Sequence, residues 1–427
     1  MPTSALPTLP SARRWQVQIL ISTWTAYAGY YFCRKAFYAV KVRGGIGDAL
    51  DLSSIELAHI GTAYLVAYSI GQFSSAFVGR RLGPKLLLLV GMALSLLCNV
   101  GFGTSNGFWT VFLFMAINGL AQGTGWPGCI GSLGHWFARK QRGSILGLWS
   151  TCYQVGSVAA TALAAFLLGV AGWRWSFFGA SIVLLGAWTI VLFLHPNTPE
   201  SKGLPSLGEE PTNGDTQAVP PKAGLGWNRN VVIAILMMGG IYFCIKFLRY
   251  ALWSWTPFFL SQSLGVDKSN AGYLSTVFDI CGFAGVILAG VLSDRWLKGR
   301  RSALSLIMLL GMTVSFGGMF WLGATNLTAF AVALGFCGFM LYGPDSLLSG
   351  VGAIDVGSAR GGLVAAGLIN GMGSIGPIFQ EQLIGWMSAK FGNDLSPVLL
   401  MFVGVACAGT ILMTVLHLRA RQGKAAV

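Results

Sequence analysis

The sequence predicts an all-α membrane protein with twelve transmembrane helices in two pseudo-symmetric six-helix halves. Composition, the recurrence of apolar segments and an internal repeat lead to this prediction. Hydrophobic residues make up 54% of the 427 residues and charged residues only 10%, whereas soluble domains carry about 25% charged residues. A chain this apolar has too little polar surface to stay in water, so we expect membrane lipid around it.

Apolar segments of about 20 residues, long enough to span a bilayer, recur along the chain. Residues 196–228 separate two groups of six and are rich in Pro, Gly and acidic residues, as in a flexible linker. The predicted domains are an N-terminal half at 1–195, a cytoplasmic linker at 196–228 and a C-terminal half at 229–427. The spans are placed near 17–40, 57–78, 86–106, 108–134, 143–170, 174–195, 229–260, 270–293, 302–323, 327–350, 361–388 and 397–418.

The distribution of basic residues orients the chain. The formal charge is +14, but Lys and Arg form short clusters between apolar runs, so we expect no nucleic-acid partner. If both termini are cytoplasmic, most basic residues outside the spans fall on the cytoplasmic side, as the positive-inside rule requires. Short termini and compact loops suit a bacterial cytoplasmic membrane, which is the expected location, and an internal membrane of a eukaryote is the alternative.

Four basic residues lie inside predicted spans, where ionisable groups are costly and rare; they are Arg34, Lys35, Lys246 and Arg249. Arg34 and Arg249 occupy equivalent places in an internal repeat. They are 215 positions apart (34 to 249), and so are Arg80 and Arg295 in the loops after the second and eighth spans. Parallel halves related by an axis along the membrane normal bring equivalent positions together near the midplane.

Polar and aromatic residues accompany these cations at helical spacing. Tyr27, Tyr31 and Arg34 share one face of the first span. The seventh and second spans carry similar faces, made of Tyr242, Lys246, Arg249 and Trp253 and of Tyr64, Tyr68 and Gln72. The three inward faces therefore offer guanidinium, ammonium, phenol and amide groups.

Buried acids are scarcer than buried cations. We find Asp279 in the eighth span, with Asp345 and Glu381 toward the ends of the tenth and eleventh. Lys35 is expected to pair with Asp279, while pairing and ligand binding stay equally open for Lys246. No further mid-span acid is expected to neutralise Arg34 and Arg249, so an anionic ligand must do so. A phosphate dianion fits, because the planar arginine fork matches its oxygens.

Other chemistry finds little support in the sequence. The eight cysteines all fall within apolar runs and form no CxxC pair, which disfavours a disulfide framework or a zinc site. No spaced Ser/His/Asp or metal-ligand cluster is apparent, so we expect neither an enzyme, such as an intramembrane phosphatase, nor a metal or cofactor.

Several segments together resemble one known family. They are YYFCRK (30–35), NGLAQGTGWPGCIGSLGHWF (118–137), FLRYALWSWTPFFL (247–260), YLSTVFDICGFAGVILAGVLSDR (273–295) and FMLYGPDSLL (339–348). The chain resembles the organophosphate:phosphate antiporters of the major facilitator superfamily, which include glycerol-3-phosphate and hexose-phosphate transporters and sugar-phosphate exchangers. The resemblance implies the major facilitator fold and exchange of an organic phosphate for inorganic phosphate by alternating access.

The resemblance also implies roles for particular residues. Arg34 and Arg249 match phosphate-binding arginines, and Lys35 and Asp279 match a charge pair between the halves. Gln72, Ser254 and Tyr153 stand where the glycerol-phosphate transporter has lysine, aspartate and histidine, which favours a larger sugar phosphate. The expected substrate-binding residues are Arg34, Arg249, Lys246, Tyr27, Tyr31, Tyr68, Tyr153 and Gln154.

The remaining expectations concern the cytoplasmic loops, the substrates and the oligomeric state. Asp294, Arg295, Arg80 and Arg81 are expected to latch the cytoplasmic side. The small-molecule partners would be the organic phosphate and inorganic phosphate, and we expect a monomer. A transporter-like membrane sensor, which binds a sugar phosphate without moving it, is the alternative function.

Overall fold

The computed structural model describes residues 9–137, 145–146, 148–205, 228–295, 301–323, 326–348, 358–392 and 394–422, and these are almost entirely helical. Within these ranges, eight helical segments are long and apolar enough to cross a membrane. Each of the predicted spans coincides with helix over most of its length, except that part of 143–170 lies outside the described residues. The predicted all-α membrane fold is therefore confirmed.

The chain divides into two compact units. Unit 1 comprises residues 1–40 and 63–217, and unit 2 comprises residues 41–62 and 218–427. The sequence-based halves stay a prediction. Residues 41–62 group with the later part of the chain, and residues 206–227 of the predicted linker lie outside the described residues.

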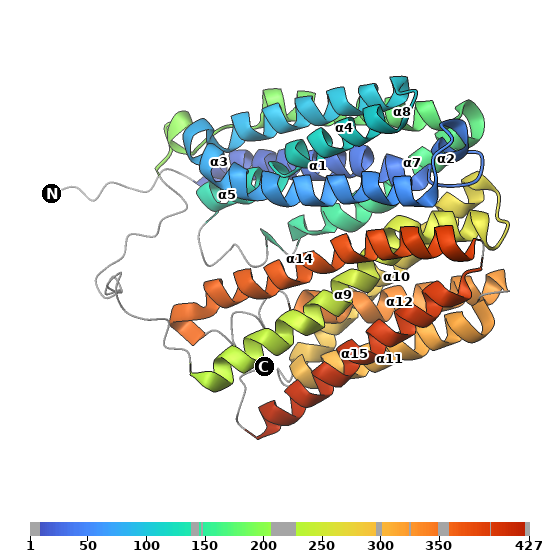
Figure 1. Ribbon diagram of the computed structural model, residues 1–427. Helices are drawn as coiled ribbons and strands as arrows, with labels where there is room; N and C mark the ends of the chain where they lie inside the picture. The colour runs from blue at the N-terminus through green and yellow to red at the C-terminus, as the bar shows by residue number, and fades with distance from the viewer. Residues whose placement is uncertain are drawn as a thin grey trace. The chain divides into compact units, whose positions relative to one another are not determined.

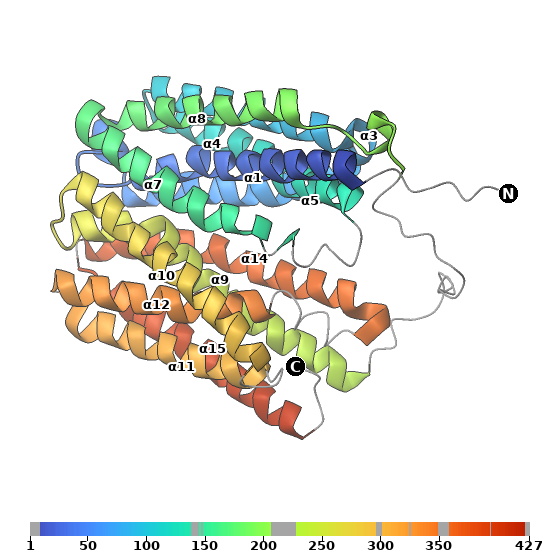
Figure 2. The same cartoon turned by 180° about the vertical axis from the view of Figure 1, so that it is seen from behind.

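Unit 1 is a helical bundle in which α1 is central. Its helices run side by side along their lengths in both views (Figures 1 and 2). Helix α1 packs against α5, α7 and α8. The elements are α1 (Leu9–Ala39), α3 (Ser54–Thr104, from residue 63 onward), α4 (Phe108–Gln122), α5 (Gly125–Trp136), α7 (Thr151–Ala171), α8 (Trp173–Leu194) and the short 3-10 turn η1 (Glu200–Lys202).

Unit 2 is a second helical bundle, in which α9 packs against α10, α14 and α15, and α10 against α12. It also holds the short helix α2 (Ile46–Ala49) and the first turns of α3. The remaining elements are α9 (Arg229–Gln262), α10 (Lys268–Arg295), α11 (Arg301–Gly318), the π-helical turn η2 (Met319–Gly323), α12 (Leu327–Leu347), α14 (Ser358–Phe391) and α15 (Ser396–Arg421).

The second and third predicted spans meet at Gly83, and the fourth predicted span is divided into two helices. The second and third predicted spans are two helices within α3 that are separated at Gly83, whose φ of 75° and ψ of 162° are non-helical. Glycine adopts this positive φ without a steric penalty, and Pro84 then restarts the helix. The predicted span 108–134 is instead divided into α4 and α5 at Gly123 and Thr124.

Glycine also permits close helix packing in unit 2. A Cβ at Gly285 of α10 would lie 2.1 Å from the carbonyl oxygen of Phe339 in α12. Small residues let helices in lipid approach this closely. We expect Gly285→Val to lower the melting temperature in detergent strongly, because a backbone carbonyl cannot move aside. Gly317→Val, in a helix with open space around the glycine, should change it little. Equal melting temperatures for the two variants would contradict this packing.

The start of α3 is stabilised by a capping box. The Glu56 carboxylate accepts hydrogen bonds from the Ser53 amide (2.9 Å) and hydroxyl (2.8 Å), and the Ser53 hydroxyl oxygen accepts from the Glu56 amide (3.2 Å). These bonds, the Ser53 amide first, lower the pKa of Glu56 below its ordinary value. Such a box stabilises a helix by about 1 kcal/mol.

The lowered pKa of Glu56 gives a pH-dependent prediction. Since its folded-state pKa lies below the unfolded value, its contribution is complete above about pH 4.3 and is lost as the pH falls further. We expect Glu56→Ala to lower the melting temperature at pH 7, and the difference from wild type to shrink below pH 4. A difference that grows on acidification would contradict the capping box.

Candidate functional site

Arg34 of α1 is buried and only partly hydrogen-bonded. Its side chain is 7% exposed, and its Nε donates to Gln122 Oε1 of α4 at 2.9 Å. Its Nη2 is buried without a hydrogen-bond partner among the described residues. No carboxylate is found paired with Arg34 in the described part of the chain. The guanidinium therefore keeps donor capacity and positive charge for a ligand.

A network of neutral groups holds Gln122 in place. Its Nε2 donates to Ser95 Oγ and to Asn118 Oδ1, both at 3.2 Å. Asn118 Nδ2 in turn donates to the Cys33 carbonyl of α1 at 3.2 Å. The network orients Arg34 without cancelling its charge. Sequence reasoning missed Asn118 and Gln122, although two amides one helical turn apart in an apolar segment are a usable signal.

Three tyrosine rings surround the Arg34 guanidinium. Its Cζ lies 4.9 Å from the ring centroid of Tyr31, 5.0 Å from that of Tyr68 and 5.8 Å from that of Tyr64. Aromatic faces attract a cation electrostatically, which stabilises it while it has no carboxylate partner. The predicted residues Tyr31 and Tyr68 are thus brought to Arg34, and Gln72 Nε2 donates to the Tyr68 hydroxyl at 2.9 Å.

An aromatic cluster continues from Tyr31 toward α5 and α7. The Tyr153 ring centroid lies 6.4 Å from that of Tyr31 and 5.2 Å from that of Tyr27. Trp126 and Trp149 complete the cluster, at 6.1 Å and 5.6 Å from Tyr153. Sequence reasoning named the three tyrosines and missed both tryptophans. Gln154, the next residue on α7, is partly buried.

Unit 2 contains the second predicted arginine in a different setting. Arg249 Nη1 of α9 forms an ion pair with Asp345 Oδ2 of α12 at 2.6 Å, and its Cζ lies 4.5 Å from the Tyr342 ring centroid. The expectation that no acid neutralises Arg249 is therefore wrong. Asp345 was expected near the end of its span, but α12 brings its carboxylate to the guanidinium.

Lys246 lies one turn before Arg249 and is held by neutral acceptors. Its Nζ donates to Asn370 Oδ1 at 2.8 Å and to Ser374 Oγ at 3.1 Å, both on α14. It also lies 4.9 Å from the Tyr242 ring centroid. The sequence left two interpretations of Lys246 open, pairing with a carboxylate and binding a ligand. The hydrogen bonds described here are to neutral groups and not to a carboxylate.

The other predicted residues are placed as follows. Lys35, in unit 1, and Asp279, in unit 2, are buried, and their pairing stays a prediction. Asp279 Oδ1 accepts a hydrogen bond from the Tyr342 hydroxyl at 2.5 Å. For the predicted cytoplasmic latch, Arg81 is exposed, and the side chains of Asp294, Arg295 and Arg80 lie outside what the structure describes.

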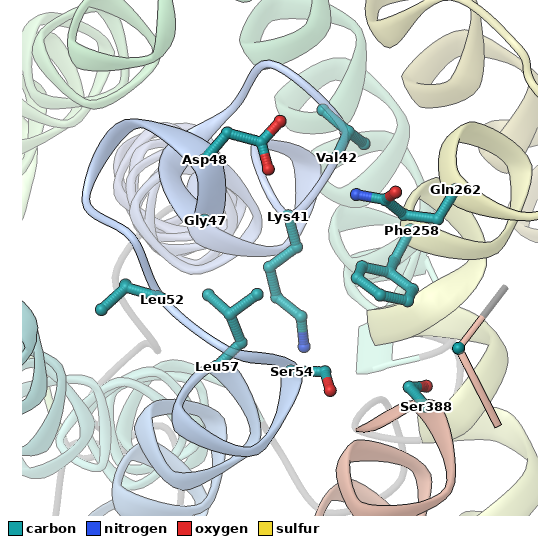
Figure 3. A pocket seen from close by; sticks show the side chains of 11 residues that line it. Lys41, Val42, Gly47, Asp48, Leu52, Ser54, Leu57, Phe258, Gln262 and Ser388 are labelled. Atoms are coloured by element: carbon teal, nitrogen blue, oxygen red, sulfur yellow. The ribbon is translucent and has the colours of Figure 1, made fainter. Parts of the chain in front are cut away.

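Glu381, the buried acid expected toward the end of the eleventh span, pairs with a lysine. It forms an ion pair with Lys41 at 2.8 Å, and both side chains are fully buried. Lys41 also lines a cavity of about 190 Å³ within unit 2, together with Asp48, Ser54, Gln262 and Ser388 (Figure 3). None of the predicted substrate-binding residues lines this cavity.

Comparison with known proteins decides the family. Residues 23–381 match the sequence family described as the Major Facilitator Superfamily. The chain belongs to the major facilitator superfamily. It is therefore a multi-pass membrane protein of a transporter family, not an enzyme. The fold agrees, since a solved bacterial homologue of the human lysosomal transporter Spinster superposes with a TM-score of 0.65 at 18% identity, covering 96% of this chain and 95% of that one.

Relatives of the chain include a membrane sensor protein and two proteins with phosphate-related names. The chain is 28% identical to the membrane sensor protein UhpC of Salmonella typhimurium, over 88% of this chain and 86% of the relative. It is 28% identical to the glycerol-3-phosphate transporter of Bacillus subtilis, over 89% and 87%. It is also 28% identical to sugar phosphate exchanger 3 of Xenopus laevis, over 86% and 80%. The resemblance read from the sequence motifs is thus confirmed.

Proposed function

We propose that this superfamily member exchanges an organic phosphate, specifically a sugar phosphate, for inorganic phosphate by alternating access. The observation that carries the proposal is the setting of Arg34. Its side chain is 7% exposed, forms no ion pair within the described residues, and keeps an unused donor at Nη2. Burying a cation this way is costly unless a ligand compensates it. A phosphate dianion supplies both the negative charge and the acceptor oxygens.

The relatives support a phosphate-bearing substrate. A glycerol-3-phosphate transporter and a sugar phosphate exchanger are similar to this chain over most of its length. The shared feature of their named substrates is the phosphate group, and Arg34 is the group in this chain suited to it. Inorganic phosphate offers the same dianion, so one site serves both substrates, and exchange follows.

Arg249 is the proposed second phosphate ligand, on the strength of the repeat that relates it to Arg34. Its ion pair with Asp345 adds a step to the mechanism. A phosphate that binds Arg249 competes with the Asp345 carboxylate, and the carboxylate returns to Arg249 when phosphate leaves. Lys246 is proposed to contact the organic part or the phosphate, because the side chains to which it donates hydrogen bonds, Asn370 and Ser374, are neutral.

This competition predicts the effect of Asp345→Asn. We expect the variant to bind inorganic phosphate about three- to tenfold more tightly, since the ligand no longer displaces a carboxylate. Release of phosphate should slow for the same reason. Equilibrium binding of labelled phosphate to purified protein measures the change. Weaker binding in the variant would mean that Asp345 orients Arg249 for phosphate and does not compete with it.

A sensor is the second candidate, because the chain is also similar to a membrane sensor protein. Proteoliposomes loaded with inorganic phosphate separate the two. Uptake of labelled sugar phosphate that depends on internal phosphate supports exchange. Binding of sugar phosphate without uptake supports a sensor and overturns the exchange proposal.

The remaining sequence expectations complete the proposal. We propose a monomer in a bacterial cytoplasmic membrane. The Lys and Arg distribution supports an orientation with both termini inside. Lys35 and Asp279 are proposed as the charge pair between halves, and Asp294, Arg295, Arg80 and Arg81 as the cytoplasmic latch. Cysteine labelling from each side of the membrane tests the orientation.

A further inference from the structure

One end of unit 1 gathers basic side chains from three elements. Helix α1 begins and helix α8 ends at this end (Figure 2). Lys85, in the part of α3 that follows Gly83, donates through Nζ to the carbonyl of Leu192, in the last turn of α8, at 2.9 Å. Lys202 of η1 lies close enough to Lys85 for the two positive charges to repel each other.

A tryptophan connects these lysines to α1. Lys202 Nζ lies 4.8 Å from the Trp15 ring centroid, and Arg14 Cζ lies 6.0 Å from it. The indole ring attracts both cations electrostatically. Arg14 and Lys202 are exposed, and Lys85 is partly buried. We call Arg14, Trp15, Lys85 and Lys202 the basic patch.

The basic patch has little negative charge around it. None of its three cations forms an ion pair with a carboxylate in the described part of the chain. Residues 1–40 and 63–205 contain twelve basic residues and a single acidic one, Glu200. One carboxylate can neutralise at most one of the three cations, so the patch stays positive and attracts anions.

Apolar side chains on the surface flank the basic patch. Leu86 of α3 is 46% exposed, and Phe193 and Leu194 at the end of α8 are 76% and 42% exposed. In a membrane protein, exposed apolar side chains contact acyl chains, whereas tryptophan collects at the border with the headgroups, where Trp15 is expected. The cations therefore lie at the depth of the lipid headgroups, with acyl chains beside them.

We propose that the basic patch binds the headgroup of an anionic phospholipid. The lipid phosphate lies among the three cations, and the acyl chains follow the exposed side chains of α3 and α8. Basic pockets between helices on the cytoplasmic side recognise anionic headgroups in this way, and the proposed orientation puts the patch on that side. The site is independent of the proposed substrate, because none of its residues is a proposed substrate-binding residue.

The test compares two lipids through the fluorescence of Trp15. Each protein, with its matching Trp15→Phe variant, is placed in nanodiscs that contain phosphatidylglycerol or phosphatidylcholine with brominated acyl chains, which quench nearby indoles. The difference between the two proteins isolates Trp15 and gives the ratio of association constants, phosphatidylglycerol over phosphatidylcholine. We expect a ratio of about ten or more in the wild type, and Lys85→Gln and Lys202→Gln should each lower it about fivefold.

A second lysine–tryptophan pair provides a matched control. Lys390 Nζ lies 4.8 Å from the Trp386 ring centroid on α14, which is the spacing of Lys202 and Trp15. Lys390→Gln should leave the Trp15 ratio at its wild-type value. Lys85→Arg should also retain the ratio, because it keeps the positive charge, and it thus separates loss of charge from loss of packing.

Three outcomes overturn the lipid site. The first is equal association of the two lipids with the wild type, as expected if Glu209, Glu210 and Asp215 of the linker neutralise the patch. The second is an unchanged ratio in both Lys85→Gln and Lys202→Gln. The third is a ratio that inorganic phosphate lowers at constant ionic strength, which assigns the patch to a soluble anion and not to a lipid.

Discussion

Arg34→Lys should reduce exchange of sugar phosphate for inorganic phosphate by about 10²- to 10⁴-fold. The substitution keeps the positive charge but loses the planar guanidinium with its several N–H donors. In the wild type, Arg34 Nε donates to Gln122 while the other nitrogens are available to phosphate, and a single ammonium cannot do both. Two lost charge-assisted hydrogen bonds, at about 1.5–3 kcal/mol each, give that range. Labelled phosphate uptake by phosphate-loaded proteoliposomes measures the loss.

The control for this experiment is another arginine of unit 1. Arg174 donates through Nη1 to the carbonyls of Gly103 and Ser105, at 2.8 Å and 2.9 Å, and these contacts fix a loop. Arg174→Lys should therefore retain most of the exchange activity. Wild-type exchange in Arg34→Lys would show that the guanidinium fork does not bind the transported anion.

Lys41→Met should destabilise unit 2 by about 3–5 kcal/mol, which is typical when one partner of a buried ion pair is removed. Both side chains of the Lys41–Glu381 pair are fully buried. Without Lys41, the Glu381 carboxylate keeps its hydrogen bonds from Ser254 Oγ and Gln380 Nε2, both at 3.0 Å, but loses its counter-charge. The melting temperature in detergent, followed by tryptophan fluorescence, measures the change.

A second substitution separates the ion pair from general packing damage. Replacing both partners, in Lys41→Met with Glu381→Leu, should restore most of the stability, because apolar pairs often replace buried ion pairs at little cost. Lys390→Met, at an exposed lysine of α14, should change the melting temperature little. A double variant as unstable as Lys41→Met alone would argue against an uncompensated charge as the cause.

The fold was predictable because lipid imposes strong constraints on sequence. Twenty-residue apolar segments, linker composition and a repeat of charged positions all follow from the bilayer and from the two-half architecture. The turn between the second and third spans was harder to place, since only Gly83 departs from helical backbone angles there. Helix ends such as Leu9 and Arg421 extend past the apolar segments, because a helix does not stop where hydropathy does.

The candidate site was only partly predictable. Helical spacing correctly placed Tyr31 beside Arg34, because residues three apart share a face. Spacing within one helix says nothing about partners on other helices. Gln122 at Arg34, Asp345 at Arg249 and Glu381 at Lys41 all depend on packing between segments distant in sequence. The unused donor at Arg34 Nη2 is visible only in three dimensions, since composition gives no indication of an unmade hydrogen bond.

The most direct measurement of the central claim is a structure determined with arsenate, a phosphate analogue whose anomalous scattering locates it. We expect arsenate oxygens within hydrogen-bond distance of Arg34 Nη2 in the wild-type protein, and loss of that anomalous peak in Arg34→Lys. A wild-type structure in which arsenate binds elsewhere while Arg34 Nη2 pairs with a carboxylate would contradict the account.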